Sequence, residues 1–384
     1  INGWDYVRGL SGKIMELMPS PLPGYDKQMN RMELVQQCLF LACSPRLVES
    51  DGGALLLNVL FDKFVRNLCI SFNLQNILQG QSFRTFAEEK DCKTEDFETK
   101  QCKKKNCFTN EWDAIYGFLN SLNELLSSHI TMISETPFHL RYKSPKDRIH
   151  GFLTFLRQVL PQLKLRDVWN SNQWTVEKKA QWGELLRRLL ENVLQIGHLS
   201  LELHTRGIPS KHISYKHMYI YIYIYMIYVC IYNGKSDPTK KSIEVTRDQN
   251  DEIVEEDNGG VQMLGVDCRG HMQFSGLTDY SDQQSEQIIV VSSWLGVKEA
   301  CWCLAQFVET CPLPKHDTTE KHIFYPMEKK HVVDVGKFFL QTLQTTCHSG
   351  VIEKSHIGFT LVCKELLDSG KISFALFFLG KKKN

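Results

Sequence analysis

Apolar residues recur with the 3.6-residue period of an α-helix in five successive segments of this 384-residue chain. No convincing β-strand pattern separates these segments. A succession of amphipathic helices predicts an all-α fold, an α-solenoid of HEAT or armadillo type with disordered loops. No clean sequence period near 40 residues marks individual repeats. The five segments are 29–47, 54–78, 111–133, 146–163 and 176–204, the last with the stripe Trp182, Leu185, Leu186, Leu189, Leu190 and Val193.

The pattern divides the chain into four parts. Residues 1–206 are predicted to form a helical solenoid segment, and 285–368 a second helical domain. Between them, 207–284 is predicted to be a linker that includes the acidic, polar and disordered stretch 235–260. Residues 369–384 form an atypical tail. Within the first part, 20–24 is predicted to connect two helices, and Gly52-Gly53 and Ser144-Pro145 to begin helices.

Residues 218–232 alternate tyrosine and isoleucine with few interruptions. Such a strand is apolar on both faces and prone to aggregate, and it is too short to span a membrane as a helix. An alternating TA repeat in DNA translates to Ile-Tyr, and single changes give Met, Val and Cys. We therefore interpret the segment as translation of a non-coding repeat. A genuine edge strand is the alternative.

The net charge of +1 gives no global basic field for nucleic acid, so any RNA contact must come from local patches. Thirteen cysteines are scattered, and several lie on apolar faces, as reduced core thiols do. These thiols favour an intracellular, cytoplasmic protein. No signal peptide and no apolar run of about 18 residues is present, so membrane insertion is not predicted. The chain begins without methionine and is expected to be an internal fragment of a longer protein.

Motifs for catalysis are mostly absent: the sequence has no P-loop, no Gly-x-Ser-x-Gly and no His-Glu-x-x-His. The segment 265–270 lacks a Gly-x-Gly core and is better explained as a turn than as a nucleotide or S-adenosylmethionine site. Neither the loosely spaced Cys92, Cys102 and Cys107 nor Cys301 and Cys303 predict a metal site. His198 and His204 lie near a helix end and are expected to be solvated, or to interact favourably with the helix dipole, and not to be catalytic. The chain is therefore predicted not to be an enzyme and to hold no cofactor.

Two groups of basic residues are candidate phosphate contacts for RNA, although solvated helix faces are the favoured explanation for them. Both groups lie in or beside predicted helices of the first part of the chain. They are Arg141, Lys143, Lys146 and Arg148, and Lys178, Lys179, Arg187 and Arg188.

Two amphipathic helices near the C-terminal end carry polar and aromatic residues that a core helix does not need. The first begins at Trp294 and runs to Cys311, with Lys298 and Glu299 beside its apolar stripe. The second follows His348 and runs to Leu367. In the second, a glycine supplies a turn at the start, a carboxylate lies in the first turn, and another glycine allows close helix approach. These three residues are Gly350, Glu353 and Gly358, and Phe359 follows them.

This combination resembles the conserved-domain signature of the THADA family, the thyroid adenoma-associated protein and its fungal tRNA-modification counterparts. The family's pattern is Trp-Arg-x-x-Lys-Glu, then His-x-Gly-Ala-x-Glu leading to Gly-Phe. Leu295 stands in place of the usual Arg, which removes a phosphate or carboxylate contact, and Val351 in place of Ala. The matching residues are Trp294, Lys298, Glu299, His348, Gly350, Glu353, Gly358 and Phe359.

The resemblance implies a helical scaffold without chemistry of its own. Family members bind a tRNA 2′-O-methyltransferase of the FtsJ/RrmJ type and direct it to nucleotide 32 of the anticodon loop. The partner would supply S-adenosylmethionine and the catalytic residues, and the solenoid would hold the tRNA. The alternative is a general solenoid interaction scaffold, such as a regulator of transport or of a membrane pump, with no role in RNA.

Overall fold

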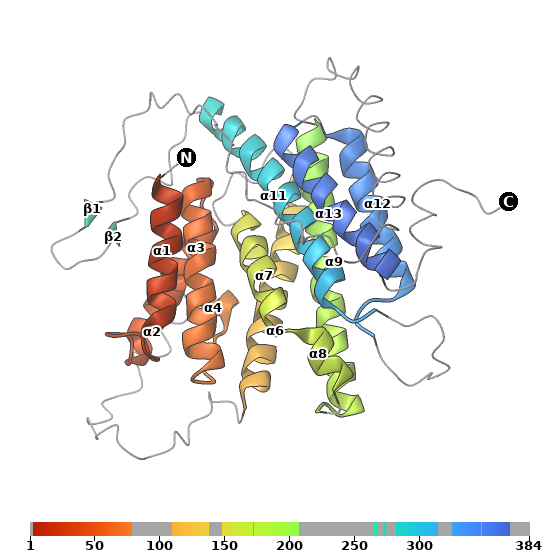
Figure 1. Ribbon diagram of the computed structural model, residues 1–384. Helices are drawn as coiled ribbons and strands as arrows, with labels where there is room; N and C mark the ends of the chain where they lie inside the picture. The colour runs from red at the N-terminus through yellow and green to blue at the C-terminus, as the bar shows by residue number, and fades with distance from the viewer. Residues whose placement is uncertain are drawn as a thin grey trace.

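The computed structural model describes nine stretches of the chain, which together hold the predicted helical parts. Within these stretches the chain is helical apart from connecting turns and two very short strands (Figure 1). The described residues are 3–78, 110–137, 148–171, 173–206, 265–266, 272–273, 282–313, 325–346 and 348–368.

The N-terminal helices are short, and the long ones follow after residue 110. The first set is α1 (Gly3–Leu17), α2 (Gln28–Ala42), α3 (Leu47–Leu60), the π-helical turn η1 (Phe61–Arg66) and α4 (Leu74–Leu78). The second set is α6 (Glu111–Glu135), α7 (His150–Gln162), α8 (Leu165–Asn170) and α9 (Val176–Arg206). The last set is α11 (Asp282–Thr310), α12 (Lys329–Thr345) and α13 (Ser349–Asp368).

The helices stack in two layers, as an α-solenoid requires. One layer runs from α3 through α7 and α11 to α13, and each of these helices packs on the next. The other runs from η1 and α4 through α6 and α9 to α12. Helix α9 joins the layers by packing along α11, and α12 joins them by packing on α13. In Figure 1, α7 and α13 lie on either side of α11. The predicted all-α class is therefore confirmed, and the HEAT or armadillo type of repeat stays a prediction.

The core between the layers is continuous along the stack and rich in aromatic side chains. Trp182 on α9 is almost fully buried and stacks on Trp174, with ring centroids 5.1 Å apart. Trp112 on α6 meets the Trp182 ring edge-on at 5.5 Å. Edge-on and offset ring pairs of this kind add about 0.5–1.5 kcal/mol to the burial of apolar area. These ring contacts therefore hold α6 against α9.

The predicted helix 54–78 is wrong as a single element. The real helix α3 begins earlier, at Leu47, and widens into η1 after Leu60. Cys69 then adopts a φ of 53°, which a right-handed helix cannot contain. This break explains why Cys69 lies in a turn and not on a helix face. The helix resumes only as the short α4.

Gly52 and Gly53 do not begin a helix, because both lie inside α3. A Cβ atom at Gly53 would lie 2.4 Å from the backbone nitrogen of Ala42, so the glycine allows α2 and α3 to touch. The connector at 20–24 is confirmed between α1 and α2. Ser144 and Pro145 lie outside the described residues.

Three helices were not predicted from the sequence: α1, the short α8, and α12. Helix α12 buries Val332, Val335, Phe338 and Phe339, a helical pattern that lies outside the two C-terminal segments predicted above. Helix α1 has part of its apolar surface exposed, which weakens the amphipathic signal. Its exposed apolar residues are Val7, Leu10, Ile14 and Leu17.

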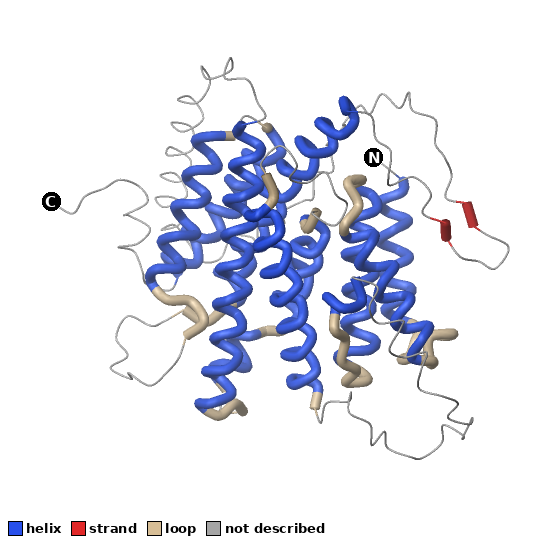
Figure 2. Tube along the Cα trace, turned by 180° about the vertical axis from the view of Figure 1, so that it is seen from behind, coloured by secondary structure: helices blue, strands red, loops and turns tan. Residues whose placement is uncertain are grey.

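Part of the predicted linker contains a small antiparallel ladder. Strands β1 (Gly265–Val266) and β2 (Met272–Gln273) pair with each other (Figure 2), so residues 265–266 of the predicted turn 265–270 are extended; 267–270 lie outside the described residues. The segments 218–232, 235–260 and 369–384 lie outside the described residues. In the part of the chain that the structure describes, no helix is long and apolar enough to cross a membrane.

The cysteines of the described helices are free thiols. Burial raises the pKa of Cys38 and of Cys301 to about 12, so both are protonated and behave as apolar core residues. Cys92, Cys102, Cys107 and Cys347 lie outside the described residues. Within the described ranges, no group of three or more His, Cys, Asp or Glu is placed to hold a metal ion.

Candidate functional site on helix α11

Three half-buried residues form a stripe along α11: Trp294, Lys298 and Trp302. They follow one another at intervals of four residues, which places them on one face of the helix. Most of the rest of this part of α11 is buried against α7, α9 and α13, and Leu295 is completely inaccessible. The stripe, together with Gln306, Glu309 and Thr310 near the end of α11, is therefore the part of the signature helix that solvent and a partner can reach. Leu295, where the family usually has Arg, is a core residue here.

Trp294 is held in place by a residue from the start of α13. Its indole stacks on the imidazole of His348, with centroids 4.4 Å apart and planes 15° apart. The backbone N–H of His348 donates to Thr346 Oγ1, and Thr346 Oγ1 lies 3.0 Å from His204 Nε2. On Trp294, Lys298 Nζ lies 5.8 Å from the ring centroid. Trp294 thus joins the two halves of the sequence signature.

The expectation that His204 is solvated was wrong. Its side chain is 3% exposed, at the C-terminal end of α9. Burial, with a smaller contribution from His348, lowers the pKa of His204 to about 4. His204 is therefore neutral at physiological pH and serves to position the turn before α13. His198, by contrast, is exposed and packs edge-on against Phe338.

Trp302 is flanked by two cations from neighbouring helices. The guanidinium carbon of Arg157 on α7 lies 4.8 Å from the ring centroid, and Lys354 Nζ on α13 lies 5.8 Å from it. A cation over an indole ring is worth about 0.5–2 kcal/mol, more when water is excluded. Lys354 also forms an ion pair at 2.6 Å with Glu353, an exposed member of the signature. Sequence reasoning missed Arg157, because no spacing rule links α7 to α11. It also missed Trp302, although the four-residue spacing from Lys298 places Trp302 on the same face of α11.

Glu299 lies beneath the stripe and is only 4% exposed. Its carboxylate pairs with Arg157 Nε at 3.2 Å and lies 4.0 Å from Lys298 Nζ. Two cations therefore share one buried carboxylate. This arrangement explains the Lys-Glu dipeptide of the signature as an electrostatic unit that ties α11 to α7.

Of the two glycines of the signature, Gly358 is placed as predicted and Gly350 is not. Gly350 lies inside α13 and supplies no turn, and Glu353 lies beyond the first helical turn. Gly358 does allow close approach: an added Cβ would lie 2.8 Å from Phe339 Cε1 and 3.2 Å from the carbonyl oxygen of Cys301. Phe359 is buried next to Phe339, with ring centroids 6.0 Å apart. The second half of the signature is mainly a packing element.

Replacing Gly358 and Gly350 by alanine should change stability in opposite directions. At Gly350 an added methyl group makes only ordinary contacts, 3.4 Å from His348 Cε1, so helix propensity should stabilise the chain by up to about 1 kcal/mol. At Gly358 the overpacking cost of about 1–3 kcal/mol should exceed that gain. Urea unfolding of both variants measures the difference. Equal stability of the two variants would show that α11, α12 and α13 are not in close contact.

Four of the candidate phosphate contacts lie on α9 and already contact groups of the chain. Lys178 pairs with Asp113 at 3.1 Å, and Lys179 Nζ lies 3.5 Å from the carbonyl oxygen of Ser171. Arg188 donates to Asn120 Oδ1 at 3.2 Å. Arg187 pairs with Glu184, and with Glu328 at 3.8 Å. The two arginines are therefore not simply solvated, as the sequence suggested.

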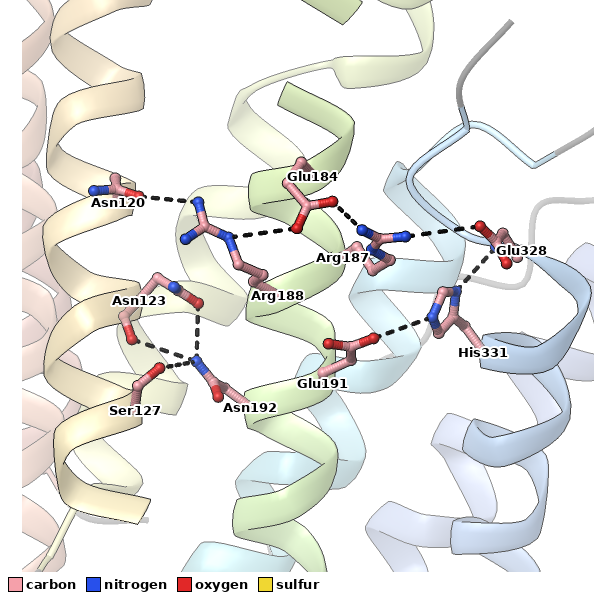
Figure 3. Close-up of polar contacts among 10 residues, drawn as sticks. All are labelled: Asn120, Asn123, Ser127, Glu184, Arg187, Arg188, Glu191, Asn192, Glu328 and His331. Atoms are coloured by element: carbon pink, nitrogen blue, oxygen red, sulfur yellow. Dashed lines mark hydrogen bonds and ion pairs between the residues drawn. The ribbon is translucent and has the colours of Figure 1, made fainter. Parts of the chain in front are cut away.

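Figure 3 shows that the arginine contacts belong to a polar network joining α6, α9 and the start of α12. Asn192 donates to Asn123 Oδ1 and to Ser127 Oγ, both at 2.9 Å. His331 lies 3.4 Å from Glu191 and accepts the backbone N–H of Glu328 at 3.1 Å. This network connects helices α6, α9 and α12 within one layer. Arg187 and Arg188 therefore have a structural role.

The other group of candidate contacts is mostly outside the described residues: Arg141, Lys143 and Lys146 all lie there. Arg148 is described and is 1% exposed, so as placed it does not face solvent. Its charge and that of Lys298 add to burial in lowering the pKa of His150 to about 3. Arg148 therefore contributes to the interior beside α11 and not to the outer surface.

Comparison with known proteins assigns the part of the chain that carries this stripe. The family described as THADA/TRM732, DUF2428, matches residues 226–377. The match covers less than half of the chain, and it is over these residues that the chain is similar to the THADA/TRM732 family. The matched region begins within the predicted linker, ahead of 285, and includes the whole of the signature. No solved structure matches the chain.

A curated relative gives a functional name to the family. An 89-residue stretch is 28% identical to the tRNA (32-2′-O)-methyltransferase regulator THADA of Drosophila melanogaster. That stretch makes up 22% of the chain and 5% of the Drosophila protein. The chain is thus similar, over a short stretch, to a much longer protein whose name is that of a regulator of a tRNA methyltransferase.

Proposed function

We propose that this chain is a non-catalytic scaffold in the cytoplasm that partners a tRNA 2′-O-methyltransferase of the FtsJ/RrmJ type. It would assist methylation of nucleotide 32 in the tRNA anticodon loop. The observation that carries the proposal is the match of residues 226–377 to the THADA/TRM732 family, in which a relative is named a regulator and not a methyltransferase. S-adenosylmethionine would then be bound by the partner.

The fold supports a role in holding other molecules. Two layers of helices present long side surfaces on which a tRNA and an enzyme could lie at the same time. The stripe on α11 is a candidate contact because its indoles and cations are half-exposed, whereas its neighbours on α11 are buried. The polar network of α9 and the glycine contact of α13 would keep this surface rigid.

The proposal is tested by reconstituting the methylation reaction. The cognate methyltransferase is incubated with unmodified tRNA and S-adenosylmethionine, with and without the purified 384-residue chain. We expect 2′-O-methylation at nucleotide 32 to increase when the chain is added, and the chain to capture the enzyme in a pull-down.

The controls separate the competing functions. The chain with tRNA and S-adenosylmethionine, but without the enzyme, should give no methyl transfer; methylation there would make the chain itself an enzyme. Failure to capture the methyltransferase, together with no affinity for tRNA at low salt, would overturn the proposal. That result would favour a general interaction scaffold.

A further inference from the structure

We infer that the α11 stripe, formed by Trp294, Lys298 and Trp302 with the flanking Arg157 and Lys354, binds the phosphodiester backbone of RNA. The inference rests on the proposed function and specifies which of its two partners this surface contacts. The stripe lies on α11, in the layer formed by α3, α7, α11 and α13, whereas the polar network of Figure 3 joins α6, α9 and the start of α12.

The first argument is charge. Three cations belong to the stripe, namely Arg157, Lys298 and Lys354, and two carboxylates neutralise part of their charge, Glu299 and Glu353. Three positive minus two negative charges leave one net positive charge. Glu299 is buried beneath the surface, whereas the side chains of Arg157 and Lys298 are 25% and 20% exposed. Glu353, by contrast, is 50% exposed and pairs with Lys354, so the cations that a ligand meets without an exposed carboxylate beside them are Arg157 and Lys298.

The second argument is the availability of the Lys298 ammonium group. Among the described residues, Lys298 Nζ has no hydrogen-bond acceptor; its contacts are Glu299 at 4.0 Å, the limit of an ion pair, and the Trp294 ring. An ammonium group has three N–H donors, and a phosphate oxygen is a strong acceptor for them. The indole restricts where the lysine can move, which lowers the entropic cost of forming that contact.

The third argument concerns the indoles. One face of Trp294 stacks on His348, and cations lie over the rings of both tryptophans. These ring faces are therefore already used, and bases cannot stack on them freely as they do on open aromatic platforms. The described part of α11 has one large, well-exposed apolar side chain, Val290, so the stripe also lacks the open apolar area of a protein interface. The groups that remain available for binding are the cationic side chains, and these suit contacts with phosphate.

Lys298→Gln tests the inference, because it removes the charge and keeps most of the side chain. Binding of the 384-residue chain to unmodified tRNA is measured by fluorescence anisotropy over a range of salt concentrations. Loss of a charged phosphate contact should weaken binding about tenfold at low salt. It should also reduce the slope of log K against log salt by about one. Lys298→Arg should restore most of the affinity.

Lys337→Gln is the matched control, because Lys337 is an exposed lysine on α12, in the other layer, and pairs with Asp334 at 3.7 Å. It should leave tRNA affinity and the salt slope unchanged. Circular dichroism and urea unfolding check that each variant is folded, and pull-down of the methyltransferase is measured in parallel.

The outcomes distinguish the inference from the proposed function. If Lys298→Gln binds tRNA as well as the unchanged chain but captures less methyltransferase, the stripe is a protein interface; the inference is wrong and the proposed function stands. If the unchanged chain captures the enzyme but binds no tRNA, the inference is again wrong. If it binds neither partner, the proposed function is wrong as well.

Discussion

Lowering the pH from 7 to 5 is expected to destabilise the folded chain by several kcal/mol. Three buried histidines cause this effect. Burial lowers the pKa of His129 and of His204 to about 4, and that of His150 to about 3, with smaller contributions from Arg148 and Lys298 for His150 and from His348 for His204. In the unfolded chain a histidine has a pKa of about 6.5. The unfolded state therefore binds more protons than the folded state at pH 5.

The sign and the size of the effect follow from proton linkage. A lowered pKa contributes stability that is complete above about pH 6.5 and is lost as the pH falls toward the folded pKa. Each pH unit in that window costs about 1.4 kcal/mol per histidine, so by pH 5 each histidine costs about 2 kcal/mol. Three such groups together approach the total stability of an ordinary domain, about 5–15 kcal/mol.

Urea unfolding at a series of pH values between 7 and 5 measures the loss, as a fall in the free energy of unfolding. His150→Leu is an informative variant, because both ring nitrogens of His150 are buried and have no hydrogen-bond partner among the described residues. It should reduce the slope of stability against pH by about one proton. A free energy of unfolding that stays constant or rises toward pH 5 would show that these histidines are not buried in the folded chain.

The sequence predicted long helices better than their connections. Helices α6 and α9 were placed within two residues at each end, because their apolar period is long and regular. The broken segment after α3 was not predicted, because the left-handed conformation of Cys69 has no marker in the sequence, such as a glycine or asparagine. The period of apolar residues shows which face of a helix is buried. It does not show the backbone conformation of a single turn.

In the candidate site, too, contacts within one helix could be predicted from the sequence, whereas contacts between helices could not. The neighbouring positions of Trp294 and Lys298 follow from their spacing on one helix. Arg157, which completes the site, lies far away in the sequence, and only the packing of α7 on α11 brings it to Glu299 and Trp302. His204 was expected in solvent for a related reason: the turn that buries it comes from the residues before α13. Neighbours across a helical layer cannot be derived from one sequence alone.

Arg157 and Glu299 should have unequal effects on stability when each is removed. Arg157→Leu leaves the Glu299 carboxylate buried with only Lys298, at 4.0 Å, to compensate it, and should cost about 3 kcal/mol. Glu299→Leu leaves Arg157, which is 25% exposed and can turn toward water while remaining near Trp302, so its cost should be nearer 1 kcal/mol. The order of these two costs is a direct test of which charge is buried.

The double variant Arg157→Leu with Glu299→Leu decides whether the pair acts as a unit. Replacing a buried ion pair by apolar side chains is often neutral, so the double variant should be more stable than Arg157→Leu alone. Urea unfolding of the four proteins gives the coupling free energy, with Arg157→Lys as the control that keeps the charge. Additive costs would mean that Arg157 and Glu299 do not pair. A favourable coupling would show that the Lys-Glu dipeptide of the signature joins α11 to α7 and so supports the cationic stripe on the surface above it.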